Sequence, residues 1–243
     1  MWPERWANST LALGFGQLFF MSHCVLCREN EGPICTRCLE QMSQNRERCP
    51  RCALTTARWA NLKKGCSVCR RRHLGFDEAI AVGSYEGPVR DLCLRLKSVH
   101  SAWLASRGAK LLMETRGERL RASAADILVP VPLHWRRRLQ RGYNQSYAIA
   151  KGLKAMLDLP LENMLSRTLP TSKLAQRGRG EREEMMHDAF VALPRFDLKG
   201  KTVMLVDDIL TTGATCGACA RALKKAGAKR VIAVVLARVE DLV

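Results

Sequence analysis

The sequence predicts an α/β protein with a mainly parallel sheet flanked by helices, preceded by a small cysteine-rich module. From residue 76 onward, short apolar runs typical of buried strands alternate with segments of helical spacing. Eight of the eleven cysteines form Cys-x-x-Cys pairs within the first 70 residues. One apolar run ends in two adjacent aspartates and a Thr/Gly-rich loop, a pattern typical of a ligand site at the carboxyl end of a strand.

The first 22 residues carry an apolar run from Leu11 to Met21 that contains two glycines. This run is too short to span a bilayer, which takes about 20 apolar residues, and no small-residue cleavage site follows it before Cys24. We therefore expect an amphipathic helix over residues 1–22 and no transmembrane segment. Without an export signal, we expect a cytoplasmic protein whose cysteines are reduced.

Residues 23–75 form the cysteine-rich module, which is poor in apolar residues and needs metal or disulfides to hold it together. Four thiolates complete the tetrahedral site that structural zinc prefers. The module therefore predicts two structural zinc ions, with a single zinc or disulfides as the alternatives. Sequential quartets and interleaved pairing both fit the spacing. The predicted ligands are Cys24, Cys27, Cys35, Cys38, Cys49, Cys52, Cys66 and Cys69.

The remaining residues, 76–243, are predicted to form the α/β domain. Its strands are expected where apolar runs are short and continuous, and its helices where apolar residues recur at spacings of three and four. The expected strands are Glu78–Tyr85, Ile127–Val131, Ala189–Leu193, Thr202–Val206 and Val231–Ala237. The expected helices are Pro88–Ser98, Leu104–Leu120, Asn144–Leu157 and Thr212–Ala226, with a connecting segment over Pro160–Pro170 and a mobile loop over Leu174–Met186. A fifth cysteine pair, Cys216 and Cys219, is interpreted as core packing on the last helix, and so is Cys93.

Asp207 and Asp208 follow the strand that ends at Val206, and Thr211 to Thr215 opens the next helix. A helix N-terminus with free amides and hydroxyls binds anions, and a glycine at position 213 permits close backbone approach. Two carboxylates in front of it are suited to a ribose diol, or to Mg²⁺ shared with a second phosphate. The segment therefore predicts a sugar-phosphate site, whereas a simple capped helix needs only one such residue.

This segment resembles the phosphoribosyl pyrophosphate signature of type I phosphoribosyltransferases. Taken with the cysteine module, nearly the whole chain resembles the ComF family, which carries a zinc-binding head on a phosphoribosyltransferase-like body. The resemblance extends to Leu96-Lys97, to Val129-Pro130-Val131-Pro132-Leu133-His134, and to Arg138 with Arg141-Gly142-Tyr143-Asn144-Gln145. It implies a type I phosphoribosyltransferase-like fold and a role in natural competence, the uptake of DNA by bacteria.

The resemblance also implies a role for individual residues. Asp207 and Asp208 would be the catalytic pair that meets the ribose hydroxyls. Lys97, Val131 and Pro132 would lie near the pyrophosphate, and the loop 171–182 would be a flexible lid. The 5′-phosphate would be held by Thr211, Thr212, Gly213, Ala214 and Thr215.

The stretch from His134 to Gln145 concentrates four arginines and two aromatic residues in a chain of net charge +17. Arginines pair with phosphates and aromatic rings stack on bases, so single-stranded nucleic acid would fit this stretch. The pyrophosphate end of a nucleotide-like ligand would fit it equally well, and a solvated charge run is the third alternative. The candidate nucleic-acid residues are Arg136, Arg137, Arg138, Arg141 and Tyr143, and the basic face would extend to Arg46, Arg48, Arg51, Arg70, Arg71 and Arg72.

Two functions follow from these patterns. The first is a competence-associated protein needed for natural transformation, which binds phosphoribosyl pyrophosphate or a related nucleotide ligand, binds single-stranded DNA and docks on other competence or DNA-processing proteins. The second is an active Mg²⁺-dependent phosphoribosyltransferase of nucleotide metabolism or salvage. Both functions fit the sequence, with or without catalysis of phosphoribosyl transfer.

Overall fold

A computed structural model describes residues 23–29, 32–43, 46–57, 62, 65–133, 139–167, 189–194 and 197–240. The contacts within the chain form two compact units, Met1–Met42 and Ser43–Val243. The first unit contains helix α2 (Thr36–Met42). The expected helix over residues 1–22 and the expected lid over 171–182 lie outside the described residues. The expected domain limits at residues 22 and 75 stay a prediction.

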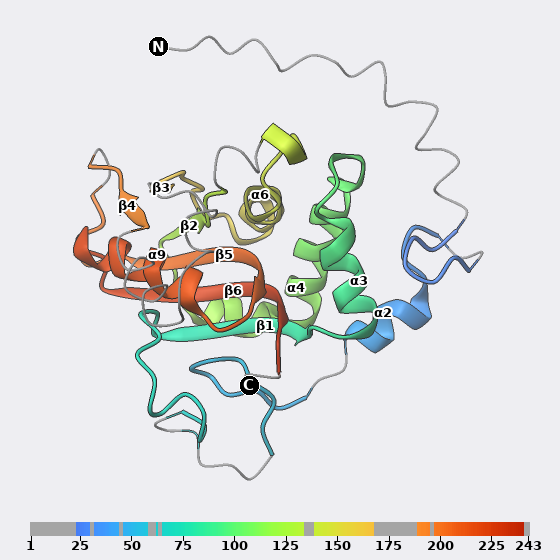
Figure 1. Cartoon of the computed structure of the whole chain (residues 1–243), viewed down its shortest axis with the longest axis horizontal. Coiled ribbons are helices and arrows are strands. Elements are labelled where there is room, and N and C mark those ends of the chain that lie inside the picture. Colours follow the sequence, from blue (N-terminus) through green and yellow to red (C-terminus); the bar gives the residue numbers. More distant parts are fainter. Residues whose placement is uncertain are drawn as a thin grey trace, which may run out of the picture. The chain divides into compact units, whose positions relative to one another are not determined.

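Four parallel strands form the central sheet of the second unit (Figure 1). Their order across the sheet is β1 (Glu78–Ser84), β6 (Arg230–Arg238), β5 (Thr202–Leu210) and β2 (Ile127–Pro130). Each strand coincides with an apolar run, as expected for strands buried on both faces. Because every pairing is parallel, the carboxyl ends of all four strands meet at one edge of the sheet. The predicted parallel sheet is confirmed.

Helices cover both faces of this sheet. One face carries α3 (Gly87–Arg95), α4 (Leu104–Ala122) and α6 (Gln145–Leu157), with a short 3₁₀ turn at Val99–Ser101 between α3 and α4. The opposite face carries α9 (Ala214–Lys225). Helix α6 begins where the Asn144 side chain accepts hydrogen bonds from the amides of Ser146 and Tyr147.

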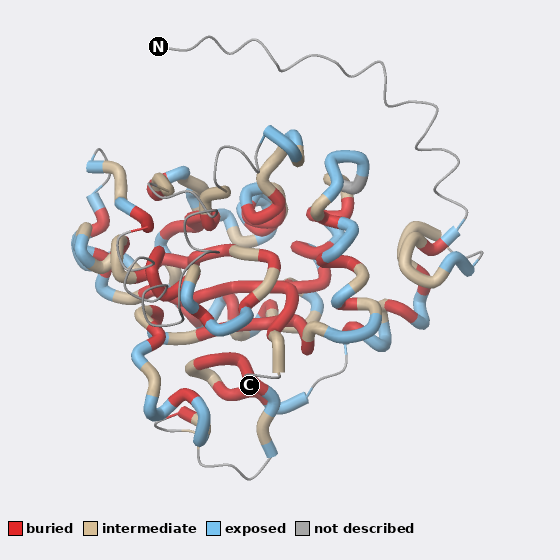
Figure 2. Tube along the Cα trace, viewed as in Figure 1, coloured by how far each residue is buried: buried red, intermediate tan, exposed pale blue. Residues whose placement is uncertain are grey.

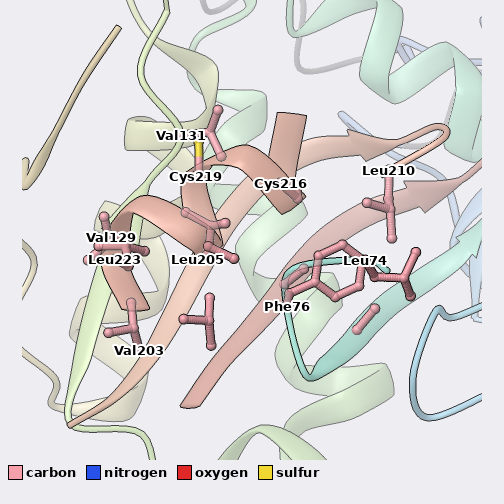
Figure 3. Close-up of a cluster of buried hydrophobic side chains, with 14 of the residues drawn as sticks. Leu74, Phe76, Val129, Val131, Val203, Leu205, Leu210, Cys216, Cys219 and Leu223 are labelled. Carbon is pink, nitrogen blue, oxygen red and sulfur yellow. The ribbon is translucent and has the colours of Figure 1, made fainter. Parts of the chain in front are cut away.

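The strict alternation of side chains along each strand separates two apolar layers. Val203 and Leu205 of β5 point toward α9, where they pack with Cys216 and Cys219 (Figure 3). Figure 2 shows the strands of the sheet as almost continuously buried. The prediction that Cys93, Cys216 and Cys219 are core residues is confirmed, since each is at most 1% exposed.

The structure differs from the expected elements at three places. Strand β5 continues past Val206 to Leu210, because residues 207 to 210 still pair with β6. Helix α9 begins at Ala214 instead of Thr212, after Gly213 in a left-handed conformation (φ 87°). The expectation of a simple connection over 160–170 was wrong: β3 (Leu165–Arg167) pairs antiparallel with β4 (Phe190–Ala192) in a second sheet.

Among the helices that the structure describes, none combines the length and the apolar character needed to cross a bilayer.

The crossing of α4 and α6 depends on a missing side chain. A Cβ at Gly152 would lie 2.5 Å from the Cβ of Ala109, so Gly152→Ala should lower the free energy of unfolding by about 1–3 kcal/mol. Gly117→Ala is the matched control within a helix, because its Cβ would meet the ends of two flexible side chains, Arg121 at 3.2 Å and Met113 at 3.5 Å. That control should be neutral or stabilising by up to about 1 kcal/mol. Urea denaturation measures both, and equal effects would contradict the close packing.

Candidate functional site

The eight predicted zinc ligands form two separate clusters. Within each cluster the four Sγ atoms lie within 4.8 Å of one another. The pairing is sequential, so the interleaved alternative is excluded. The first quartet is Cys24, Cys27, Cys35 and Cys38, and the second quartet is Cys49, Cys52, Cys66 and Cys69.

The spacing of the sulfur atoms fits zinc. Sulfurs about 2.3 Å from a tetrahedral ion are separated by about 3.8 Å, and five Sγ–Sγ distances within the two quartets run from 3.4 to 3.9 Å. A disulfide would need about 2.05 Å, and every cysteine is free. Both quartets could therefore hold a zinc ion with no open coordination position, which is the arrangement of a structural site.

Hydrogen bonds to Cys49 in the second quartet favour the thiolate, the form that binds a cation. The backbone amide of Cys66 donates to Cys49 Sγ at 3.3 Å. Hydrogen bonds from the Cys52 thiol and from backbone amides lower the pKa of Cys49 to about 4, against the opposing effect of burial. A thiolate is the form that ligates metal.

The second quartet belongs to the same compact unit as the sheet, and ionic contacts join them. Arg48 donates to Glu240 at 2.9 Å and to Ser84 Oγ at 2.9 Å. Glu240 also accepts from the Thr55 amide at 3.0 Å. The expectation that Arg48 extends a basic face was wrong, because its side chain is 4% exposed and its charge is paired.

The two aspartates occupy the carboxyl-terminal part of β5, and both accept hydrogen bonds from the start of α6. Asp207 Oδ1 accepts from Ser146 Oγ at 2.8 Å and from the Asp208 amide at 2.9 Å. Asp208 Oδ2 accepts from Gln145 Nε2 at 3.3 Å. The N-terminal turn of α6 therefore orients both carboxylates.

Burial raises the pKa of Asp207 well above its usual value, and the neighbouring Asp208 carboxylate raises it further. Hydrogen bonds from Ser146 and from the Asp208 amide act in the opposite direction. Two adjacent acids in one buried place repel each other, and such pairs are common where a cation or a hydroxyl-rich ligand relieves the repulsion.

A pocket of about 200 Å³ opens beside this acidic pair. It brings together residues that were predicted separately from the sequence: Lys97 after α3, Val131 and Pro132 after β2, the aspartates of β5, and Thr215 on α9. Its lining also includes Arg141, which the sequence reading assigned to nucleic acid. Lys97, Arg141 and Arg167 thus line the same concave site as the two carboxylates, which is an arrangement suited to a phosphorylated sugar.

Gln145, Ser146 and Arg167 also line the pocket, but the sequence reading gave none of them a role. For the first two a signal existed, because Gln145 ends the stretch from His134 to Gln145 and Ser146 follows it directly. Arg167 stands on β3, the strand that was not expected.

Tyr143 is tied to the residue before Lys97. Its hydroxyl donates to the carbonyl of Leu96, and burial raises its pKa to about 12. The hydroxyl is therefore committed to an internal contact, whereas stacking of the ring on a base stays a prediction. The other candidates of this stretch, Arg136, Arg137 and Arg138, lie outside the described residues.

The loop after β5 carries the remaining predicted phosphate ligands. Thr211, Thr212 and Ala214 are exposed, and Gly213 is buried. Thr212 Oγ1 accepts from the Ala214 amide at 3.3 Å. Only Thr215 of this loop contributes to the pocket lining itself, so the loop forms the rim beside it.

A larger hollow of about 450 Å³ lies elsewhere in the second unit, between the residues after Cys69 and α9. Its cations already have partners: Lys224 pairs with Asp77 at 2.7 Å, and Arg51 donates to the carbonyls of Cys69 and Arg72. It contains no residue from the carboxyl edge of the sheet, so the pocket at Asp207 is the better candidate site.

Comparison with known proteins identifies a family domain in this chain. The family model "Phosphoribosyl transferase domain" matches residues 145–241. A purine phosphoribosyltransferase from Pyrococcus horikoshii aligns with 57% of this chain and 85% of its own, at 23% identity and a TM-score of 0.36. The expected type I phosphoribosyltransferase fold is confirmed by the matching domain together with the parallel sheet.

The chain is also similar to two competence proteins and to a DNA utilization protein. Competence protein F of Haemophilus influenzae is 29% identical, covering 88% of this chain and 95% of its own length. DNA utilization protein YhgH of Salmonella typhimurium is 28% identical, over 86% and 93%. Competence protein ComFC of Bacillus subtilis is 33% identical, over 42% and 39%. These matches confirm the resemblance to the ComF family.

The raised pKa of Asp207 predicts a stability change with pH. A group that holds its proton more tightly when folded stabilises the fold at low pH and loses that contribution as pH rises through its folded pKa. Asp207→Asn cannot ionise but keeps an oxygen for Ser146. We expect its melting temperature to exceed that of the wild type at pH 7.5, with the difference closing toward about pH 4, the ordinary aspartate range.

Thermal melts at pH 7.5 and pH 4.5 test this expectation. Asp197→Asn is the matched control, because Asp197 only caps the turn at Lys199 on the surface. A wild type that is more stable than Asp207→Asn at pH 7.5 would show that the carboxylate is not under repulsion.

Proposed function

We propose that this chain, a homologue of competence protein F, ComFC and YhgH with a phosphoribosyl transferase domain, binds phosphoribosyl pyrophosphate with Mg²⁺ and serves DNA uptake in natural transformation. The observation that carries the ligand assignment is the pocket itself. In it, Lys97, Arg141 and Arg167 oppose Asp207 and Asp208.

The charges of the pocket match the parts of this ligand. The two aspartates are suited to the ribose hydroxyls, because ionised carboxylates accept two hydrogen bonds each from a diol. The cations around Lys97 are suited to the pyrophosphate, and Mg²⁺ would join phosphate oxygens to a carboxylate. Thr211, Thr212, Gly213, Ala214 and Thr215 would hold the 5′-phosphate at the start of α9.

Single-stranded DNA is the second proposed ligand. The similarity to a competence protein and to a DNA utilization protein supports a role in handling DNA, and the net charge of +17 supports binding to a polyanion. With Arg141 in the pocket and Tyr143 bound internally, the proposed contacts fall on Arg136, Arg137 and Arg138, together with the exposed Arg70 and Arg71.

The proposed setting is the cytoplasm, where reduced thiols would keep both quartets ready for zinc. Docking on other competence or DNA-processing proteins is part of the same proposal. Active phosphoribosyl transfer is the alternative function, favoured by the acidic pair beside a pocket that would enclose the reacting carbon. Release of pyrophosphate on mixing phosphoribosyl pyrophosphate, Mg²⁺ and a panel of nucleobases would select that alternative.

The ligand assignment predicts a loss of binding when the acids are neutralised. In calorimetric titration with Mg²⁺ and phosphoribosyl pyrophosphate, we expect the double variant Asp207→Asn/Asp208→Asn to bind about 100-fold more weakly or worse, because hydrogen bonds to two charged acceptors are lost. The surface variant Asp197→Asn should bind like the wild type. Unchanged affinity in the double variant would remove the acids from the ligand site.

The DNA assignment predicts a salt-dependent affinity. For a single-stranded oligonucleotide, the logarithm of the binding constant should fall linearly with the logarithm of salt concentration. Changing Arg136, Arg137 and Arg138 together to Gln should reduce that slope by about 2, since each phosphate contact contributes about 0.7. A charge-matched control changes Arg107, Lys110 and Arg121 of α4 to Gln. A flat salt response of the wild type would argue against electrostatic DNA binding.

A further inference from the structure

The second quartet contacts the phosphate loop, defined here as residues 210–217, through a buried arginine. Arg238, at the end of β6, is 2% exposed. Its Nε donates to the carbonyl of Cys52 at 2.8 Å, and its Nη1 donates to the carbonyls of Leu210, at 2.8 Å, and Thr211. One guanidinium therefore joins a residue of the metal cluster to the start of the phosphate loop.

The segment that follows Cys69 makes the second connection. Arg72 Nη2 donates to the carbonyl of Thr212 at 3.3 Å. The backbone of this segment then touches the backbone of α9: a Cβ at Gly75 would lie 2.5 Å from the Gly217 carbonyl oxygen, and a Cβ at Gly217 would lie 2.3 Å from that of Leu74. No side chain separates the two backbones here.

Apolar contacts complete the connection. A Cβ on Gly213 would meet the Phe76 ring at 3.4 Å and Leu74 at 3.8 Å. Figure 3 shows Leu74 and Phe76 lying beside Leu210, at the end of β5. The Gly217 amide donates to the Gly213 carbonyl at 2.7 Å, so the first turn of α9 is tied to the same support.

These contacts connect the second quartet to the phosphate loop, which borders the ligand pocket. We infer that a metal ion in the second quartet fixes the phosphate loop through Arg238 and the segment 70–76, so that metal occupancy of this quartet sets the affinity of the pocket for a ribose phosphate. Arg238 is a positioning residue in this relation. The first quartet belongs to the other compact unit and does not control the loop.

The charge of the loaded metal cluster also favours the position of Arg238. A zinc ion bound by four thiolates carries a net charge of −2. Arg238 is buried and donates to carbonyl oxygens, which are neutral acceptors. A buried guanidinium is stabilised by nearby negative charge, and the loaded cluster supplies it beside Cys52. Loss of the ion would remove the local order around Cys49, Cys52, Cys66 and Cys69 and weaken the support of the loop.

The inference rests on the proposed ligand, but its first test needs no ligand. Hydrogen exchange of the amides of residues 211–217 and zinc content are measured for the wild type, for Cys66→Ser in the second quartet, and for Cys27→Ser in the first. Each variant should lose about one zinc per chain. Only Cys66→Ser should speed exchange in the loop, by about tenfold or more.

Titration with Mg²⁺ and phosphoribosyl pyrophosphate then tests whether loss of the second metal site weakens ligand binding. Cys66→Ser should bind about tenfold more weakly or worse, while Cys27→Ser should bind like the wild type. If the wild type does not bind this ligand at all, the proposed function fails, whereas the exchange data still decide whether the second quartet orders the loop.

Arg238→Lys keeps both quartets and serves if Cys66→Ser fails to fold. Lysine keeps the charge but lacks the forked geometry that reaches separate carbonyls. We expect two zinc ions per chain, faster exchange at residues 211–217 and weaker binding. Equal loop exchange in the wild type, Arg238→Lys and Cys66→Ser would overturn the inference, as would a wild type that contains no zinc in the second quartet.

Discussion

The parallel pairing of β5 between β2 and β6 is the constraint on which the candidate site depends. It brings the carboxyl ends of three strands to one edge, where each delivers a different component: Pro132 after β2, the acidic pair on β5, and Arg238 at the end of β6. The apolar faces of β5 are filled on both sides, so its register cannot shift without exposing Val203 to Val206. The acids are held in place by the same packing that stabilises the sheet.

The N-terminal turn of α6 adds the polar part of this support. Ser146 and Gln145 donate to Asp207 and Asp208 from one helix start, and Asn144 both caps that helix and donates to the carbonyl of Val131 at 3.1 Å. A single polar stretch thus fixes the helix, the turn after β2 and the carboxylates together. Substitutions here would act on the site by changing orientation instead of removing a ligand group.

The sequence was sufficient for features that depend on local pattern. Strands buried on both faces leave continuous apolar runs, and Cys-x-x-Cys spacing specifies a knuckle, so the parallel sheet and both quartets could be predicted. Contacts between distant parts of the chain left no such pattern. Arg48 reads as one more basic residue, yet it pairs with Glu240 across 192 positions. Arg141 reads as part of a charge run, yet it lines the pocket, and β3 is too short to leave a signal.

The ion pair between Arg48 and Glu240 also bears on the order in which the protein can mature. The outermost ligands of the first quartet are separated by 14 positions, so this quartet can close from a short stretch of chain. The second quartet is different: Cys52 contacts Arg238, 186 positions later, and Arg48, next to Cys49, pairs with Glu240, 192 positions later. Its cysteines therefore reach their final surroundings only after β6 has joined the sheet. The first quartet can load zinc early in folding, whereas the second reaches its binding geometry together with the folded domain.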